Sequence, residues 1–110
     1  PDVSSFADCV RSEAAAAPWG AVGAAIAHCH RAGARHADLN AHNLLIDRER
    51  KPWLIDWDKG TVESGPGAWC AGVLDRLERS LRKRVQGLRE GVLEQGMRTL
   101  RKAHALELGA

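Results

Sequence analysis

Apolar residues recur at helical spacing between two residues that favour helix ends. Val22, Ala25, Ile26 and Cys29 follow the i, i+3, i+4, i+7 pattern, which places them on one face of a helix. Proline suits the first turn of a helix and glycine the position just after its end; residues 18 and 33 are proline and glycine. The pattern predicts a core helix between them, with many small residues that allow close packing.

Two short apolar runs flank a polar loop in the middle of the chain. Residues 44–46 read Leu-Leu-Ile, residues 53–55 read Trp-Leu-Ile, and the intervening segment contains a proline. The runs are too short for helices and predict a β-hairpin, and their continuous apolarity indicates burial on both faces, with Trp53 in the core. If the loop closes symmetrically, Leu44 lies opposite Ile55 and Asn43 lies opposite Asp56.

The remaining apolar positions predict three more helices: a short one near the start of the chain, a longer one over about residues 71–86, and a final one. Their inner faces consist, in that order, of Val3, Phe6, Val10 and Ala14; of Leu74, Leu77, Leu81 and Leu88; and of Val92, Leu93, Met97 and Leu100. Glycine, proline and serine gather in residues 61–67, which predicts a loop. The expected fold class is therefore α+β, mostly helical with one small β-hairpin.

Composition restricts the class of protein. At 110 residues the chain is one domain or a part of one, and 45% hydrophobic residues suffice for a core. No run of 18 apolar residues occurs, so we expect no transmembrane helix. Three widely spaced cysteines are too few for a disulfide scaffold and fit free thiols in a reducing compartment. We therefore expect a cytoplasmic protein, which still leaves room for peripheral contact with a membrane.

Charge is unevenly distributed along the chain. The net charge is +2, but residues 76–110 carry nine Lys or Arg against four Glu, so residues 1–75 are net negative. Arg76, Arg79 and Lys83 share one face of the predicted helix, opposite its leucines. A solvated outer face and a patch attracted to anionic lipid or lipopolysaccharide are both open interpretations. Nucleic-acid binding is disfavoured, because no aromatic residues interleave with the basic ones.

Three oxygen-bearing side chains converge on the open end of the predicted hairpin. Asn43 and Asp56 flank its two strands, and directly paired residues in an antiparallel ladder lie roughly 4.5–5.5 Å apart. Amide and carboxylate oxygens at that separation can share a Mg²⁺ ion, with water and phosphate oxygens in its remaining positions. Asp38, in the loop before Asn43, supplies a third ligand or a general base. Phosphoryl transfer needs these groups, since it depends mainly on positioning and on neutralising phosphate charge.

The spacing of these residues resembles that of the protein-kinase superfamily. Its catalytic loop reads His-x-Asp-x-x-x-x-Asn and is followed, across a short hairpin, by Asp-Phe-Gly. The matching residues here are His36, Asp38, Asn43 and Asp56, with Trp-Asp in place of Phe-Gly. Residues 38–43 (Asp-Leu-Asn-Ala-His-Asn) and 55–60 (Ile-Asp-Trp-Asp-Lys-Gly) are similar to bacterial kinases of 3-deoxy-D-manno-octulosonic acid (Kdo), a sugar of the lipopolysaccharide inner core. The similarity covers about residues 18–85.

The resemblance implies a role for each residue. Asp38 would be the catalytic base that accepts the proton of a sugar hydroxyl, and His36 would brace the loop through hydrogen bonds. Asn43 and Asp56 would hold the Mg²⁺ bound to the phosphates of ATP, and Asp58 would bind the metal or support its ligands. The implied reaction transfers the γ-phosphate of ATP to the 4-hydroxyl of Kdo on a lipid A precursor, at the cytoplasmic face of the inner membrane.

The resemblance also implies a fold. Residues 1–110 would form a kinase-like C-terminal lobe, with a catalytic loop at 36–43, a metal-binding motif at 56–58 and a helical tail over about 71–108. The sequence shows no Gly-rich phosphate loop, no Val-Ala-Ile-Lys lysine and no partner glutamate. We therefore expect the nucleotide-covering N-terminal lobe to be absent and these residues alone to be inactive. Asn40 replaces the lysine common in protein kinases, which favours a non-protein substrate.

Two other hypotheses stay open. Aminoglycoside and choline kinases share the His-x-Asp-x-x-x-x-Asn and Ile-Asp-aromatic patterns, but commonly have glycine, proline or histidine where this chain has Ala37, Asn40 and Ala41. A non-catalytic remnant that only binds anionic lipid is the alternative outside the enzymes. A Gly-rich loop and a buried lysine upstream in the intact reading frame would favour the enzyme.

Overall fold

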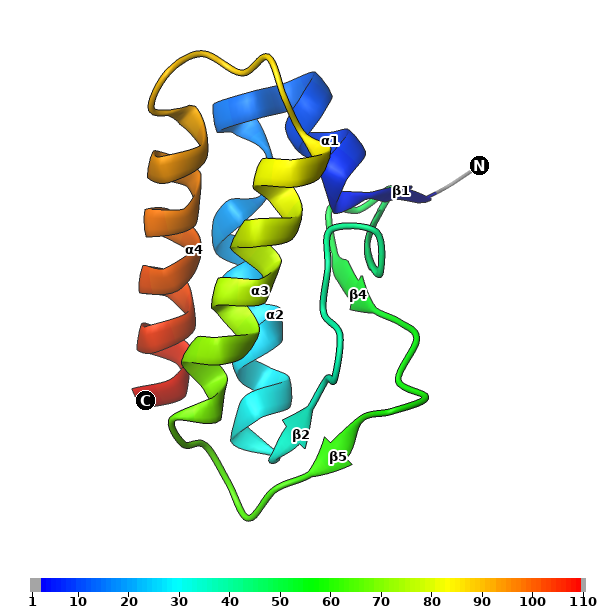
Figure 1. Cartoon of the computed structure of the whole chain (residues 1–110), viewed down its shortest axis with the longest axis vertical. Helices are drawn as coiled ribbons and strands as arrows, with labels where there is room; N and C mark the ends of the chain where they lie inside the picture. The colour runs from blue at the N-terminus through cyan, green and yellow to red at the C-terminus, as the bar shows by residue number, and fades with distance from the viewer. Residues whose placement is uncertain (1–2, 110) are drawn as a thin grey trace.

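Three long helices lie beside two small antiparallel sheets in the computed structural model, which describes residues 3–109 (Figure 1). The elements in chain order are β1 (Val3–Ser5), α1 (Phe6–Glu13), the short 3-10 helix η1 (Ala14–Ala16), α2 (Trp19–Arg31), β2 (Ala34–Arg35), β3 (Leu44–Asp47), β4 (Pro52–Leu54), β5 (Thr61–Val62), α3 (Trp69–Arg84) and α4 (Val92–Gly109). One sheet has the order β1-β3-β4, and the other pairs β2 with β5. The structure is therefore mixed α and β, with mostly helical content.

The core collects buried residues from α1, α2, β3, α3, α4 and the loop before β3, and within it α2 and α4 make the most extensive contact of any two elements. Val22 and Ile26 of α2 are fully buried, as is Leu100 of α4. Gly23 allows the close approach, because a Cβ there would lie 2.1 Å from the Leu100 carbonyl oxygen. The predicted core helix is confirmed within one residue of its expected ends. It ends at Arg31, and Gly33 follows its cap with a φ of 80°, which favours glycine.

The two C-terminal helices are also confirmed. Leu74, Leu77 and Leu81 of α3 are buried, whereas Leu88 lies beyond the helix in the connection to α4. The inner face of α4 carries the expected apolar residues, of which Leu93, Met97 and Leu100 are buried. Within residues 3–109, no helix combines the length and the apolarity that crossing a membrane requires.

The start of the chain differs from the prediction. Val3 belongs to strand β1 and pairs with Asp47 of β3, so the first helix begins only at Phe6. Ser5 ends the strand and caps the helix, since its hydroxyl oxygen accepts a hydrogen bond from the Asp8 N–H at 3.1 Å. The predicted loop at 61–67 likewise begins with a short strand, β5, which pairs with β2.

The β3–β4 hairpin forms as predicted, but its register is shifted by one residue. Leu44 pairs with Leu54 and not with Ile55, and the Ile55 N–H donates to the Asn43 carbonyl oxygen at 3.0 Å. Asn43 is therefore level with Ile55, and Asp56 follows one position beyond the pair. The symmetric pairing of Asn43 with Asp56 was wrong.

A tight loop explains the shift. The Asp47 N–H donates to the Lys51 carbonyl at 3.0 Å, so only residues 48–50 separate the strands. Arg50 closes this loop with a φ of 68°, in the left-handed region that three-residue hairpin loops use before a bulge. The Asp47 carboxylate accepts hydrogen bonds from the main-chain N–H groups of Glu49 and Lys51 at 2.9 Å each. Glycine is the usual residue at a left-handed position. Because residue 50 is an arginine, the sequence did not indicate this turn.

Trp53 lies at the surface and not in the core. Its side chain is 50% exposed, because β4 is an edge strand of its sheet. The indole N–H donates to Asp47 at 2.9 Å, and the Lys51 ammonium lies 4.8 Å from the ring centroid. The bond from Trp53, followed by the main-chain bond from Lys51, lowers the pKa of the Asp47 carboxyl. The prediction of burial on both faces was therefore wrong for this strand.

Candidate active site

His36 connects the two halves of the candidate site. Its ring is 4% exposed and lies between the Asp38 N–H, at 3.0 Å from Nδ1, and the Ile55 carbonyl oxygen, at 2.8 Å from Nε2. Because an N–H faces Nδ1, this nitrogen accepts and Nε2 carries the proton that it donates to Ile55. Trp57 packs against the ring, with centroids 4.8 Å apart. The expected bracing of the loop by His36 is thus present in the geometry.

Asn43 holds the opposite end of the loop. Its side chain is 7% exposed; Nδ2 donates to the Asp38 carbonyl oxygen at 2.9 Å, and Oδ1 accepts from the Asn40 N–H at 2.8 Å. The carbonyl oxygen of an amide has two lone pairs, so Oδ1 keeps one acceptor site. The residue therefore shapes the loop and still presents one oxygen ligand.

The loop is anchored to two helices. The Ala41 N–H donates to the Ser80 hydroxyl of α3 at 2.9 Å, and the Ala41 carbonyl accepts from the Ala7 N–H of α1 at 3.2 Å. Leu39 and Ala41 are fully buried in the core beside these bonds. Alternating buried and exposed residues thus fix the loop so that Asp38 points out of the core.

Asp56 occupies a backbone conformation that few residues adopt. Its φ is 67°, in the left-handed region, which Asp and Asn tolerate better than most side chains. Such conformations cost on the order of 1 kcal/mol and often occur at functional sites. A turn follows, in which the Gly60 N–H donates to the Trp57 carbonyl at 2.8 Å. The turn brings Asp58 and Lys59 next to Asp56.

The structure gathers the predicted side chains around one cavity of about 250 Å³, lined by Ala37, Asp38, Asn43, Asp56, Asp58 and Lys59. Four of the five predicted site residues line it, and the fifth, His36, lies behind them as a brace. Three carboxylates, one amide and one ammonium group thus face a common space. The shifted register did not separate them, because residues 56–59 turn back toward the loop.

Asp38 also borders a second cavity. Its carboxylate is 67% exposed and forms an ion pair with Arg76 of α3 at 2.8 Å. The cavity beside it measures about 390 Å³ and is lined by Asp38, Asn40, Arg76, Arg79, Ser80, Lys83 and Arg84. Helical spacing predicted that Arg76, Arg79 and Lys83 share one face of the helix, but it did not predict that this face lies against the catalytic loop. Ser80 lies on the same helix face, four residues after Arg76, and its hydroxyl contacts the loop. A small polar residue on a basic helix face could have indicated that contact.

The oxygen atoms of the smaller cavity fit a hard cation. Asp56, Asp58 and the free lone pair of Asn43 are the kind of donors that Mg²⁺ accepts. Across residues 3–109, no three His, Cys, Asp or Glu side chains lie close enough together to form a metal site by themselves. A metal here would therefore depend on phosphate oxygens and water for several of its ligands, which is usual for Mg²⁺.

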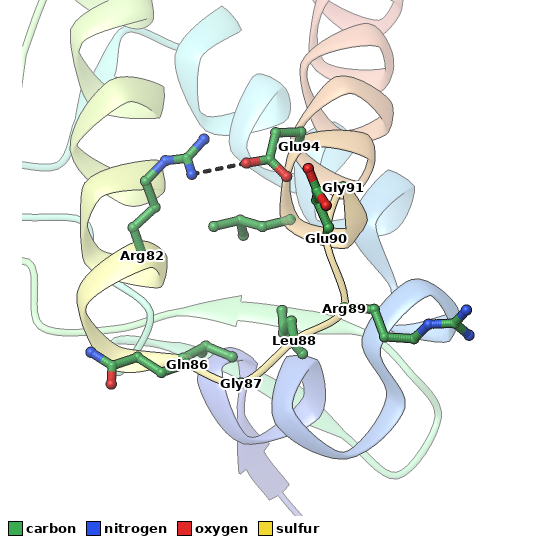
Figure 2. A pocket seen from close by; sticks show the side chains of 10 residues that line it. Arg82, Gln86, Gly87, Leu88, Arg89, Glu90, Gly91 and Glu94 are labelled. Carbon is green, nitrogen blue, oxygen red and sulfur yellow. Dashed lines mark hydrogen bonds and ion pairs between the residues drawn. The ribbon is translucent and has the colours of Figure 1, made fainter.

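A larger cavity, of about 600 Å³, lies at the connection between α3 and α4 (Figure 2). Arg82 of α3 and Glu94 of α4 form an ion pair there at 3.1 Å. None of the motif residues lines this cavity. Size alone is a poor guide to chemistry, and we therefore place the candidate active site in the smaller cavity that contains the motif residues.

Comparison with known proteins agrees with the motifs. The model of the lipopolysaccharide kinase (Kdo/WaaP) family matches residues 2–104. Relatives named 3-deoxy-D-manno-octulosonic acid kinase include one from Xanthomonas oryzae, 41% identical over 109 residues, which cover 98% of this chain and 43% of the relative. Another, from Stenotrophomonas maltophilia, is 48% identical over 81 residues, which cover 74% of this chain and 32% of the relative. The chain spans less than half the length of these relatives.

Proposed function

The chain belongs to the lipopolysaccharide kinase (Kdo/WaaP) family, and we propose that it carries the catalytic loop of a kinase that phosphorylates a hydroxyl of Kdo in the lipopolysaccharide inner core. The observation that carries the proposal is the cavity that collects Asp38, Asn43, Asp56 and Asp58. The phosphate donor would be ATP, as kinase membership implies.

Asp38 is suited to the role of catalytic base. One of its carboxylate oxygens pairs with Arg76, while the other accepts no hydrogen bond from residues 3–109. In the proposed step this carboxylate takes the proton of the acceptor hydroxyl. The hydroxyl oxygen forms a bond to the γ-phosphorus as the bond from phosphorus to the β–γ bridging oxygen breaks, and ADP leaves with those electrons. His36 and Asn43 hold the main chain of Asp38 in place for this step.

Asn43 and Asp56 would hold Mg²⁺, and Asp58 would bind the metal or steady its ligands. The ion would neutralise phosphate charge, as in other phosphoryl transfers. Lys59 lines the same cavity and would contact a phosphate or the acceptor. The left-handed conformation of Asp56 supports a functional role, since such conformations often occur at functional sites.

We assign residues 1–110 to the C-terminal lobe of a kinase-like fold. The matched relatives are more than twice as long as the region that they share with this chain, which leaves space in them for a lobe that covers the nucleotide. The lipid-linked acceptor would place the intact protein at the cytoplasmic face of the inner membrane, in peripheral contact with it.

The proposal is tested by a phosphate-transfer assay on the intact protein. Radiolabelled ATP is supplied with a Kdo-bearing lipid A precursor in one reaction, and with an aminoglycoside or choline in parallel reactions. We expect label on the Kdo-bearing acceptor alone. Label on the aminoglycoside or choline instead would assign the protein to the related small-molecule kinases, and absence of transfer to all three would favour a non-catalytic protein that binds anionic lipid.

Asp56→Asn tests the metal ligand separately. Asparagine tolerates the left-handed backbone and retains one oxygen, so the substitution removes the charge with little change in folding. We expect Mg²⁺-dependent nucleotide binding to weaken by roughly 10- to 100-fold, measured by titrating the intact protein with Mg²⁺ at fixed nucleotide. Asp47→Asn is the matched control, since this hairpin carboxylate lies outside the cavity. An unchanged titration for Asp56→Asn would contradict the ligand role.

A further inference from the structure

The two cavities that share Asp38 have opposite charge. The smaller one carries three carboxylates against the single ammonium of Lys59. The second one, which we call the basic groove, is lined by Arg76, Arg79, Lys83, Arg84, Asn40, Ser80 and Asp38, with four cations against one carboxylate. Asp38 thus lies at the boundary between an acidic and a basic space.

The cations of the basic groove are not used to hold the fold together. Within residues 3–109, no carboxylate forms an ion pair with Arg79, Lys83 or Arg84, and Arg76 pairs only with Asp38. Two other arginines, one on α3 and one on α4, behave differently. Arg82 pairs with Glu78 and Glu94, and Arg101 pairs with Asp75 and Glu78. Structural ion pairs therefore satisfy the cations on the α4 side of α3, whereas the cations of the groove are left for another partner.

The groove has a fixed position relative to Asp38. Arg76, Arg79 and Lys83 follow i, i+3, i+7 spacing and so share one face of α3 with Ser80. The Ser80 hydroxyl accepts the Ala41 N–H of the catalytic loop at 2.9 Å, which ties this face directly to the loop. An anion bound by the cations would therefore lie beside the Asp38 carboxylate.

We propose that the basic groove binds an anionic group, carboxylate or phosphate, of the molecule that accepts the phosphate. α3 would then be the element that selects an acidic acceptor, with its cations on the anionic group while the acceptor hydroxyl faces Asp38. This inference rests on the proposed function, because it takes Asp38 as the base. It adds the acceptor site, which the catalytic motif does not specify.

The shape and composition of the groove favour an acceptor over a membrane surface. All seven lining residues are polar or charged, and Asp38 is one of them. Segments that lie on membranes combine basic residues with apolar ones that insert between lipids, and this groove contains none. The nucleotide is a weaker candidate, because its phosphates are expected among the metal ligands of the other cavity.

The test is the double substitution Arg79→Gln, Lys83→Gln in the intact protein, with Lys102→Gln as the control. Lys102 is an exposed cation of α4 outside the groove. Charge-assisted hydrogen bonds are among the stronger ones, so we expect the double variant to raise KM for the deacylated, Kdo-bearing acceptor by about tenfold or more. KM for ATP should stay at the wild-type value, and Lys102→Gln should leave both constants unchanged. Arg76 is left intact because its loss would also alter Asp38.

Two measurements keep this proposal separate from the proposed function. If the wild type transfers phosphate and the double variant has an unchanged acceptor KM, the groove assignment is overturned and the kinase assignment stands. If the wild type transfers none, calorimetric binding of the deacylated acceptor decides: binding that the double variant weakens supports the groove, and equal binding overturns it. A variant that loses binding to anionic phospholipid vesicles but keeps its acceptor KM would show a membrane contact instead, and would also overturn the proposal.

Discussion

The loop side and the helix side of the molecule are held together in different ways. On the loop side, made of residues 36–43 and the β3–β4 hairpin, buried polar side chains bind main-chain groups and leave Asp38 and Asp56 exposed. On the helix side, α2 and α4 meet through apolar residues and through main-chain contact at Gly23. From this difference we predict that the exposed carboxylates of the loop side can be replaced with little effect on stability, and that packing on the helix side can be disturbed without loss of the site.

The helix side nevertheless contains one buried polar pair. His30 Nδ1 of α2 lies 2.8 Å from His104 Nε2 of α4, and the two rings are 2% and 5% exposed. Trp69 packs edge-to-face against His30 at 4.7 Å. Burial, and then the neighbouring His104, lowers the pKa of His30 to about 4; burial, and then Arg101, lowers the pKa of His104. The pair joins the helices as long as neither ring must carry a buried charge.

The largest effect that separates the two sides is expected from Asp38→Ala. Loss of a catalytic base should lower the rate of phosphate transfer by roughly 10²- to 10⁴-fold. The free energy of unfolding should change by less than about 1 kcal/mol, since the side chain makes one exposed ion pair. The hydrogen bonds that shape the loop use the main-chain N–H and carbonyl of Asp38, which the substitution keeps. Transfer assays and urea unfolding of the intact protein measure the two quantities.

Asp75→Ala is the matched control for this prediction. Asp75 is an exposed carboxylate of α3 that also pairs with an arginine, Arg101, at 3.0 Å. Its removal should leave transfer at the wild-type rate. Turnover near the wild-type value in Asp38→Ala, or an equal loss in Asp75→Ala, would rule out Asp38 as the base.

Residue spacing was sufficient to predict the loop side, except for the hairpin register and the burial of Trp53. The separation of His36, Asp38, Asn43 and Asp56 along the chain predicted which side chains gather, and these four meet at the site. The register could not be predicted because a left-handed arginine, Arg50, shortens the loop. The wrong register did not change which residues were predicted to meet, because the turn after Asp56 brings Asp58 and Lys59 to the cavity.

Apolar periodicity predicted the helix side, but it could not predict what packs against polar faces. Most of the expected residues of α2, α3 and α4 lie in the core, whereas Ala25 and Cys29 of the predicted α2 face are only half-buried. Edge position explains why Trp53 is exposed, and strand pairing explains why Val3 is not helical. Both depend on which strands become neighbours, which local pattern does not reveal. The basic groove was not predicted for the same reason. A charged helix face is expected to face solvent unless the element packed beside it is known.

Gly23→Ala should affect the helix side alone. The added Cβ would lie 2.1 Å from the Leu100 carbonyl oxygen, a main-chain atom that cannot rotate away. Overpacking of this kind costs roughly 1–3 kcal/mol, and we expect the upper part of that range by urea unfolding. Gly72→Ala is the control, because Gly72 is exposed in α3 and no neighbouring element of residues 3–109 comes within 4 Å of the place that its added methyl group would take. This substitution should stabilise the protein by roughly 0.5–1 kcal/mol. Equal stability changes in the two variants would contradict close α2–α4 contact.

A smaller effect should come from acid, which acts on the buried histidines. Because the folded pKa of His30 is lowered to about 4 from 6.5, the unfolded chain takes up a proton first as the pH falls. The stability that His30 contributes is therefore present above about pH 6.5 and is lost toward pH 4, with about 2 kcal/mol of it lost between pH 7 and pH 5. The lowered pKa of His104 acts in the same direction. The lowered pKa of Glu78 acts mainly below its ordinary value of 4.5, outside this window. Urea unfolding at the two pH values gives the change directly.

His30→Gln isolates the contribution of the pair. Glutamine can still hydrogen-bond to His104 but does not titrate, so the variant should lose the His30 share of the change in unfolding free energy between pH 7 and pH 5, whatever its stability at neutral pH. His104 keeps its own share, because burial and Arg101 still lower its pKa. His28→Gln, at an exposed position of the same helix, should keep the wild-type change. Both variants should retain phosphate transfer at neutral pH, because neither ring approaches the cavity at Asp38. An unchanged pH dependence of stability in His30→Gln would contradict the assignment of this effect to His30.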